Sequence, residues 1–318
     1  MKVRLGIDLG GSVIKAGIVS LSFKVLYRVE KPSRAEINKS EVKKSLNVVY
    51  DHLLGICRKR HYLPLSLGIG SPGTISQPLG KVTDASPNIK GWQGTVLTEV
   101  FGKTVFPVYA DNDANCAALA EYLYGFKYRY KDIVFITVGT GIGGGLIIDG
   151  KLHRGNNYAA SEIGHSILKY NGRLCKCGRR GCLEAYASVP NMLKRAYLWA
   201  KHYNQNLKPD IKPVELFSLY KRRNRVACKT IEENADFLGT SLASLVNILN
   251  PQVVVIGGGF SGAGKEYIRL IKNHIFQKAF SSSTCQLKVV KAQLGNDAGF
   301  IGASALTQVD KNGFIRKK

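Results

Sequence analysis

The sequence of 318 residues predicts an α/β protein of two domains with an internally duplicated core. Strand-like and helix-like segments alternate without a disordered linker, and one pattern of strand, glycine turn and strand occurs in both halves of the chain. A hydrophobic content of 45% is typical of a globular protein. We expect a cytoplasmic protein with no membrane partner, because we find neither a membrane-length apolar run nor the order of a signal peptide.

The first half of the chain predicts a β-meander followed by alternating helices and strands. The expected elements are strands 3–9, 13–20 and 23–30, a helix over 40–60, a strand at 63–70, a loop-rich stretch at 71–92, a strand at 104–111 and a helix over 113–125. Ser40 is placed to cap the first helix, and Gly125 to close the second. The helix over 40–60 has apolar residues at helical spacing, so it should cover the sheet.

The second half repeats the opening pattern. We expect two strands around a glycine turn within 132–153, a long helix over 230–251, strands at 252–257 and 286–294, and a closing helix over 296–308. Thr230 and Glu233 form a capping-box pattern at the start of the long helix, and Pro251 stops it. These two similar halves indicate an internally duplicated fold.

The charge is strongly positive. Lys plus Arg number 46 against 22 Asp plus Glu, which gives a net charge of +24. Such a charge attracts anionic ligands or nucleic acid. The basic clusters, such as residues 127–131 and 221–225, are too short to define a nucleic-acid groove, so a solvated basic surface is favoured and nucleic acid is not an expected partner.

Residues 165–182 contain a pattern of metal ligands. Cys175 and Cys177 are too close in sequence to pair easily with each other. With His165 and Cys182 they follow the spacing H-x9-C-x-C-x4-C, which suits tetrahedral Zn²⁺. Four protein ligands close the site to water, so the predicted zinc is structural. The alternative is a set of ordinary reduced cysteines, which the histidine and the third cysteine in register disfavour.

Three glycine-rich loops are candidates for a phosphate site, at Asp8–Lys15, Thr137–Gly145 and Ile256–Gly264. Glycine lets consecutive backbone amides approach an anion. A tight hairpin also needs glycine, so each loop alone leaves both interpretations open. None has the pattern of a phosphate-binding P-loop or of a dinucleotide fingerprint. Together the loops indicate a nucleotide held between two lobes, with Asp8 placed to reach Mg²⁺ through water.

Eight strings of the sequence carry a family resemblance: GIDLGGSVIKAGIV, GIGSPGTIS, ASPNIKGW, ADNDANCAALAE, VGTGIGGGLIIDGKL, EIGHSILKYNGRLCKCGRRGCLE, VVVIGGGFSG and GNDAGFIGAS. From residue 3 to about residue 308 the chain resembles the ROK family of sugar kinases and sugar-responsive repressors, and within it the bacterial-type glucokinases. The resemblance implies a two-lobed actin-like ATPase (RNase H-like) fold with a duplicated βββαβαβα core and a zinc-stapled loop. The expected lobes are 1–110, completed by about 298–318, and 111–297.

The resemblance also implies an activity, the ATP-dependent phosphorylation of a hexose, glucose first, at its 6-hydroxyl. Asp113 would be the base that takes the hydroxyl proton, although the local sequence alone favours a helix cap at this position. The implied sugar contacts are Gly73, Asn88, Asn112, Asp113, Glu162, His165 and Glu184. The implied contacts to ATP and Mg²⁺ are Asp8, Gly10, Gly11, Ser12, Lys15, Thr140, Gly141, Gly257, Gly258 and Gly259. His165, Cys175, Cys177 and Cys182 would hold Zn²⁺.

Two positions depart from the family pattern, and three alternatives remain. Ser12 replaces a usual threonine, and Ser161 precedes EIGH where the family has glycine, alanine, threonine or proline. The alternatives are a kinase for fructose, mannose or an N-acetylhexosamine, a DNA-binding repressor, and a nucleotide-binding protein without catalysis. Family repressors carry an additional N-terminal helix-turn-helix domain, whereas Val3 already lies in the first predicted strand. The expected partners are a hexose, a nucleotide and further copies of the chain, as a homodimer or homotetramer.

Overall fold

The computed structural model describes residues 1–84, 89–259 and 264–316. The chain divides into two compact units. Unit 1 comprises Met1–Lys131, Gly145–Ser161 and Asn296–Lys318, and unit 2 comprises Asp132–Gly144 and Glu162–Gly295. The lobe boundaries expected from the sequence, 1–110 with 298–318 and 111–297, stay a prediction.

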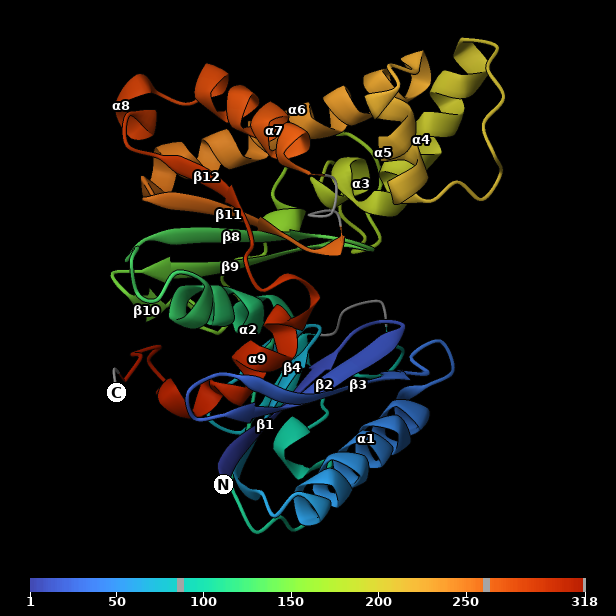
Figure 1. The fold of residues 1–318 in the computed structure, drawn as a ribbon. Helices are drawn as coiled ribbons and strands as arrows, with labels where there is room; N and C mark the ends of the chain where they lie inside the picture. Colours follow the sequence, from blue (N-terminus) through green and yellow to red (C-terminus); the bar gives the residue numbers. More distant parts are fainter. Residues whose placement is uncertain (85–88, 260–263, 317–318) are drawn as a thin grey trace. The chain divides into compact units, whose positions relative to one another are not determined.

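Unit 1 is built on a five-stranded sheet of order β3-β2-β1-β4-β7, named sheet 1 below (Figure 1). Its elements are β1 (Lys2–Leu9), β2 (Val13–Ser20), β3 (Val25–Pro32), α1 (Lys39–Lys59), β4 (Leu63–Ser71), β5 (Thr74–Ser76), β6 (Lys81–Asp84), a 3₁₀ turn (Leu97–Glu99), β7 (Val108–Asn112), α2 (Asp113–Ala120), a π-helical turn (Glu121–Gly125), β10 (Lys151–Leu152), α9 (Ala298–Ser304) flanked by 3₁₀ turns (Gly295–Asp297 and Leu306–Gln308). Strands β1, β2 and β3 are antiparallel, and β1, β4 and β7 are parallel. The carboxyl ends of β1, β4 and β7 therefore meet at one edge.

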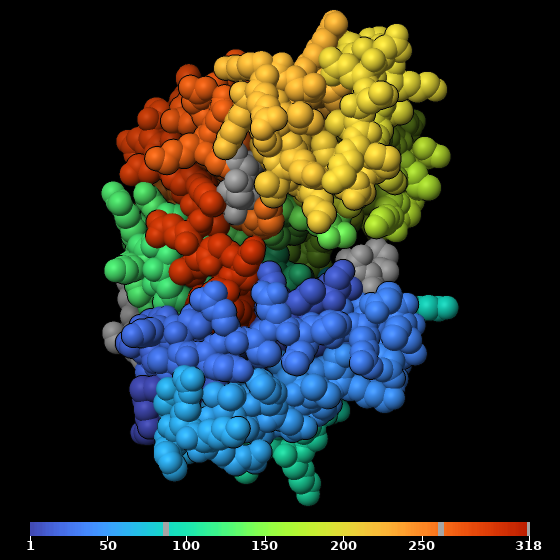
Figure 2. All heavy atoms as spheres, turned by 45° about the vertical axis from the view of Figure 1, so that its right-hand side comes forward, coloured from blue at the N-terminus to red at the C-terminus, as the bar shows by residue number. Residues whose placement is uncertain are grey.

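Helices cover sheet 1. Helix α1 packs against β2 and β3, and α9 packs against β1 and β4 on the other side (Figure 1). The close approach of α9 requires glycines in the sheet, because a Cβ at Gly6 or Gly68 would collide with the backbone of Phe300 or Ala303. Figure 2 shows the N-terminal residues, in blue, on the surface of this unit.

Unit 2 contains the remaining helices. Its elements are β8 (Ile133–Val138), a 3₁₀ turn (Ile163–His165), α3 (Glu184–Ala187), α4 (Val189–His202), α5 (Pro213–Lys221), α6 (Arg225–Leu249), β11 (Val253–Gly257), α7 (Lys265–Lys278), α8 (Ser281–Thr284) and β12 (Lys288–Lys291). Strand β9 (Ile142–Ile148) begins in unit 2 and ends in unit 1. Strand β11 is buried along its whole length and is parallel to both β8 and β12. Helices α6 and α7 pack against each other beside the strands β11 and β12 (Figure 1).

The strand orders confirm the internal duplication. The second five-stranded sheet, named sheet 2, has the order β10-β9-β8-β11-β12. Read in chain order, both sheets place their first strand at the centre, the next two strands on one side and the last two on the other. Within the described ranges, no helix combines the length and the apolar character needed to cross a membrane.

Two predicted helix caps were wrong. Helix α1 is capped by Asn38, whose Oδ1 accepts hydrogen bonds from the amides of Ser40 and Glu41, so Ser40 lies inside the first turn. Helix α6 begins at Arg225 after its cap Asn224, and the hydroxyl of Thr230 donates to the carbonyl of Val226. Asparagine caps as well as serine or threonine do, so the capping-box pattern marked an interior turn of a longer helix.

Two other elements differ from the prediction. The expected strand at 104–111 begins only at Val108, and Val105 is 98% exposed. Pro107 precedes the strand and has no amide to donate. Within the loop-rich stretch, β5 and β6 form a small antiparallel sheet. The helical run after β7 ends at Gly125 as predicted, but its last turn is π-helical from Glu121 onward.

Candidate functional site

The carboxyl edge of sheet 1 gathers acidic side chains. Asp8 lies near the end of β1, Asp111 and Asn112 end β7, and Asp113 begins α2. The register aligns Asp8 with Gly70 of β4, and Gly70 with Asp111 of β7. Three strands that are distant in sequence therefore bring the predicted magnesium-side residue and the predicted base to one edge.

The two carboxylates predicted at this edge, Asp8 and Asp113, both have raised pKa values. Burial, and next the charge of Asp113, raise the pKa of Asp8 to about 7, while Lys15 lowers it in part. Burial also raises the pKa of Asp113, opposed by hydrogen bonds from the backbone amides of Ala114 and of Asp113 itself. Lys15 lies opposite Asp8 in the β1–β2 register. A partly desolvated carboxylate with a raised pKa is suited to accept a proton near neutral pH.

Asn112, not Asp113, is the N-cap of α2. Its Oδ1 accepts hydrogen bonds from the amides of Ala114 and Asn115, and its Nδ2 donates to the carbonyl of Gly73 at 3.1 Å. Asp113 Oδ1 shares the Ala114 amide, and no side chain among the described residues hydrogen-bonds to the Asp113 carboxylate. The cap interpretation of Asp113 is therefore weakened, because Asn112 performs that function and the Asp113 carboxylate is held by backbone amides without a side-chain partner among the described residues.

A buried ion pair behind this edge was missed by the sequence analysis. The Oδ2 atom of Asp111 lies 2.7 Å from both Nε and Nη2 of Arg154, and Arg154 Nη1 donates to the carbonyl of Asp310. Both side chains are almost fully buried. The other oxygen of Asp111 accepts from the Asn112 amide at 2.7 Å and from Asn115 Nδ2 at 3.1 Å. The pair thus fixes the backbone that presents Asn112 and Asp113.

The first predicted phosphate loop forms a tight turn in unit 1. The amide of Gly10 donates to the carbonyl of Val13, and the carbonyl of Ser12 accepts from the Ser33 amide. Gly11 and Ser12 are exposed, so the turn between β1 and β2 presents its backbone outward. Beside it, Gly299 of α9 lies against the Asp8 carboxylate with no room for a Cβ. The GNDAGFIGAS string therefore supports the position of Asp8.

The predicted zinc ligands converge in unit 2. One ligand atom from each of His165, Cys175, Cys177 and Cys182 lies within 4.8 Å of the others. Cys175 Sγ is 3.9 Å from His165 Nδ1, and the Sγ atoms of Cys177 and Cys182 are 3.7 Å apart. Zn–S bonds of about 2.3 Å in a tetrahedron place sulfurs about 3.8 Å apart, so the donor set fits zinc. Burial, followed by the neighbouring thiols, raises the pKa of Cys182 to about 12, so the thiolate form is disfavoured. A bound cation would favour the thiolate and lower this pKa.

Glu184 links this cluster to the second glycine loop. Its Oε2 accepts from the amide of Ile142 at 2.9 Å, and its Oε1 lies 3.9 Å from Cys175 Sγ. Gly141 faces the same carboxylate with little room for a Cβ, and Gly164 lies directly against the carbonyl of Ile142. The ligand loop, the glycine loop and Glu184 are therefore one packed assembly within unit 2.

The remaining predicted residues lie at separate positions in unit 2 or outside the described residues. Thr140 is exposed on the second loop, and Glu162 is exposed at the start of the turn that carries His165. Gly258 has a φ of +87°, which favours glycine, and follows buried Gly257 at the end of β11; exposed Gly259 comes next. Asn88 lies outside the described residues.

Ser161, a departure from the family pattern, adopts the left-handed backbone region with a φ of 72°. Its hydroxyl is buried and has no hydrogen-bond partner among the described residues. Glycine adopts this conformation without strain. The departure therefore has a local structural cost at the residue that precedes Glu162.

The comparison with protein families matches residues 4–310 to the ROK family. The chain belongs to the ROK family. A glucokinase from Thermotoga maritima is 33% identical over 317 residues, which cover 95% of this chain and 96% of that protein. A xylose repressor from Caldicellulosiruptor bescii is 32% identical over 320 residues, covering 98% of this chain and 79% of the repressor.

A solved structure carries the same fold. The crystal structure of a ROK family glucokinase from Streptomyces griseus in complex with glucose and AMPPNP matches with a TM-score of 0.85 and 29% identity, over 96% of this chain and 98% of that chain. The expected α/β class with an actin-like ATPase architecture is thus confirmed. The individual roles of the predicted residues stay predictions.

Proposed function

We propose that this ROK-family chain is a glucokinase, which transfers the γ-phosphoryl group of ATP to the 6-hydroxyl of glucose. Relatives named as glucokinases, and a related structure that holds glucose and AMPPNP, support an ATP-dependent hexose kinase. Glucose as the preferred sugar is the finer part of the proposal. The observation that carries the kinase proposal in this chain is the Asp113 carboxylate, half-buried, with a raised pKa and no side-chain partner among the described residues, at the sheet edge that also holds Asp8.

In the proposed reaction, Asp113 accepts the proton of the sugar 6-hydroxyl as that oxygen attacks the γ-phosphorus, and ADP leaves with the electrons of the broken P–O bond. Asn112 and the Gly73 loop are joined by a hydrogen bond and would position neighbouring hydroxyls. Asp111 and Arg154 would keep the β7–α2 junction in place. Glu162, His165 and Glu184 are proposed as further sugar contacts. The two glutamate carboxylates would accept hydrogen bonds from vicinal hydroxyls of the sugar.

The proposed ATP contacts in unit 1 are Gly10 and the backbone amides of Gly11 and Ser12, with Lys15 opposite Asp8 in the β1–β2 register. The proposed contacts in unit 2 are its glycine loops. Bound Mg²⁺ would neutralise charge on the phosphates, and Asp8 would hold it through water. Zn²⁺ would be held by His165 and the three cysteines and would fix the ring orientation of His165. Its part would be structural.

The test is an ADP-release assay of the purified full chain with Mg-ATP and a panel of glucose, mannose, fructose, N-acetylglucosamine and N-acetylmannosamine. The proposal predicts the highest kcat/KM for glucose. Preference for another sugar would keep the hexose kinase and overturn glucose. Absence of turnover with every sugar in a folded, zinc-containing sample would overturn the enzyme proposal, and salt-dependent DNA binding would then favour the repressor alternative, which the xylose repressor relative keeps open.

A further inference from the structure

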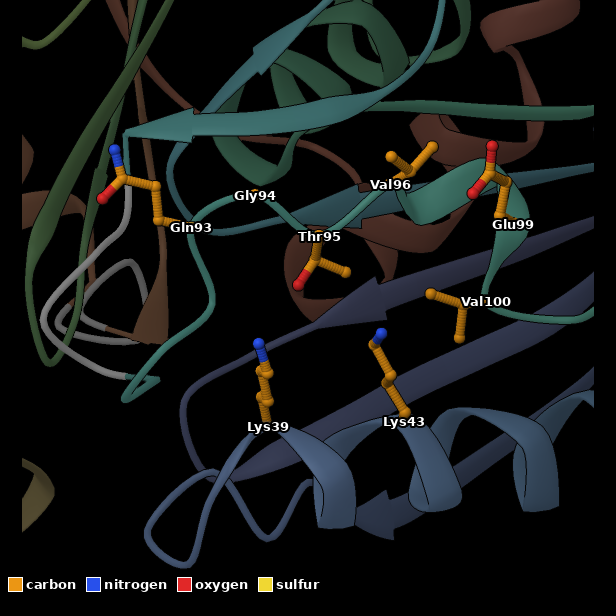
Figure 3. A pocket seen from close by; sticks show the side chains of 8 residues that line it. All are labelled: Lys39, Lys43, Gln93, Gly94, Thr95, Val96, Glu99 and Val100. Carbon is orange, nitrogen blue, oxygen red and sulfur yellow. The ribbon is translucent and has the colours of Figure 1, made fainter.

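A polar pocket lies in unit 1, lined by residues that the proposed catalytic site does not use. It has a volume of about 470 Å³ and lies between the start of α1 and the segment that follows β6 (Figure 3). Its polar groups come from Lys39, Lys43, Gln93, Thr95 and Glu99. This volume is within the usual range for small-molecule sites, roughly 300–1,000 Å³.

The Thr95 hydroxyl gives the first indication of a ligand. Thr95 is only 5% exposed, and its Oγ1 has no hydrogen-bond partner among the described residues. Its backbone is held on both sides, because its amide donates to the carbonyl of Trp92 and its carbonyl accepts from the amide of Val82. Figure 3 shows the Thr95 oxygen pointing toward the two lysines. A buried hydroxyl without a partner is unfavourable, and an acceptor in the pocket would satisfy it.

The two lysines give the second indication. Lys39 and Lys43 are one turn apart on α1, and in Figure 3 both amino groups rise toward the Thr95 segment. Neither makes an ion pair within the described ranges, because the nearby Glu41 pairs with Arg34 and Lys44 instead. Like charges at this spacing repel, and the positive end of the 21-residue helix lies beside them. An anion between Lys39 and Lys43 would remove that repulsion.

We propose that this pocket binds a hexose phosphate, with Lys39, Lys43 and Thr95 on the phosphate group. Lysine ammonium groups and a hydroxyl are common phosphate donors. The pocket is larger than a phosphate alone requires, and the exposed side chains of Gln93 and Glu99 are available to accept hydrogen bonds from sugar hydroxyls. The choice of a hexose phosphate, the product class of the kinase, rests on the proposed function.

The test is calorimetric titration of the full chain with glucose 6-phosphate, in the presence of saturating glucose so that the proposed catalytic site holds its own substrate. The double variant Lys39→Gln/Lys43→Gln should weaken binding about a hundredfold or more, since each charge-assisted contact contributes about a factor of ten. Thr95→Val should weaken it about tenfold. The control Lys24→Gln/Lys59→Gln removes the same charge from exposed positions of unit 1 and should leave binding unchanged.

Inorganic phosphate provides the second arm of the experiment. We expect it to bind in the same lysine-dependent way but more weakly than glucose 6-phosphate. Equal affinities would overturn the hexose part of the proposal. Binding that survives in Lys39→Gln/Lys43→Gln, or that falls equally in the control variant, would overturn the pocket itself. A chain without turnover on glucose that still shows lysine-dependent binding would refute the proposed function while supporting the pocket.

Discussion

Sheet 1 and sheet 2 have the same strand order but carry different chemistry at corresponding positions. The central strand of sheet 1 ends in IDLGGS, residues 7–12, and the central strand of sheet 2 ends in ITVGTG, residues 136–141. Asp8 in the first string corresponds to Thr137 in the second. The last strand of sheet 1 leads into Asp113, whereas the last strand of sheet 2 ends at Lys291.

The difference shows that topology determines where a functional group is placed and that side chains determine what it does. The central strands of both sheets, β1 and β8, end in glycine turns, so both sheets offer backbone amides at one edge. Among the described residues, only sheet 1 carries carboxylates on its own strands at this edge, at Asp8 and Asp111. Unit 2 instead gathers His165 and three cysteines into a compact cluster connected to its glycine loop through Glu184.

The largest effect should come from the cysteine cluster. Cys182→Ser should remove the metal and destabilise unit 2 by about 10 kcal/mol, the scale of structural zinc binding, because Cys182 is fully buried and contacts Cys177. Elemental analysis should find about one zinc per chain in the wild type and none in the variant. The control is Cys228→Ser, which lies outside the cluster. A Cys182→Ser protein with wild-type zinc and stability would contradict a structural metal.

The next largest effect should come from the buried Asp111–Arg154 ion pair, which stabilises the acidic edge of sheet 1. Asp111→Asn leaves the Arg154 guanidinium buried without its counter-charge, so we expect a loss of about 3–5 kcal/mol in unfolding free energy. Denaturant unfolding measures it. Glu41→Gln, which removes the charge of two more exposed ion pairs, with Arg34 and Lys44, should have a much smaller effect. Similar losses of unfolding free energy in the two variants would show that the burial of the Asp111–Arg154 pair does not cause the destabilisation.

The burial of Asp8, together with the nearby charge of Asp113, should appear as a pH dependence of stability. The folded pKa of Asp8, about 7, is above the ordinary value of 3.8, so the folded state binds a proton more tightly than the unfolded state does. Stability therefore falls as the pH rises from about 4 to about 7. Asp8→Asn should raise the Tm of the metal-free protein at pH 8 and much less at pH 5. A difference independent of pH, or one matched by the exposed control Asp51→Asn, would be inconsistent with this origin.

The smallest effect concerns Ser161, at the last residue of its unit 1 segment. Ser161→Gly should stabilise the protein by about 1 kcal/mol, because glycine tolerates the positive φ and removes a buried hydroxyl without a partner. Ser161→Ala removes the hydroxyl but keeps the backbone strain, so it should stabilise less. Thermal unfolding of both variants separates the two causes, and a larger gain for alanine would exclude backbone strain.

The sequence predicted those features that depend on local pattern. The hairpins of β1–β2 and β8–β9 were visible because apolar strands flank glycine turns, and the cysteine cluster was visible because its four ligands lie within 18 residues of sequence. The long-range features were not visible. Asp111 is a buried carboxylate near the end of β7 and needs a cation, but nothing in the neighbouring sequence selects Arg154 among 46 basic residues. The caps Asn38 and Asn224 were missed because nearby serine and threonine gave equally good patterns.

The most direct test of the account is the kcat of Asp113→Asn on glucose, measured beside the exposed control Asp51→Asn. Asparagine keeps the size of the side chain and cannot accept the hydroxyl proton. The account predicts a fall in kcat of about 10²–10⁴-fold with the KM for glucose changed only a few-fold, and a control that retains wild-type values. An Asp113→Asn enzyme whose kcat stays within a few-fold of the wild type would contradict the account, because the carboxylate at the edge of sheet 1 would then not be the base.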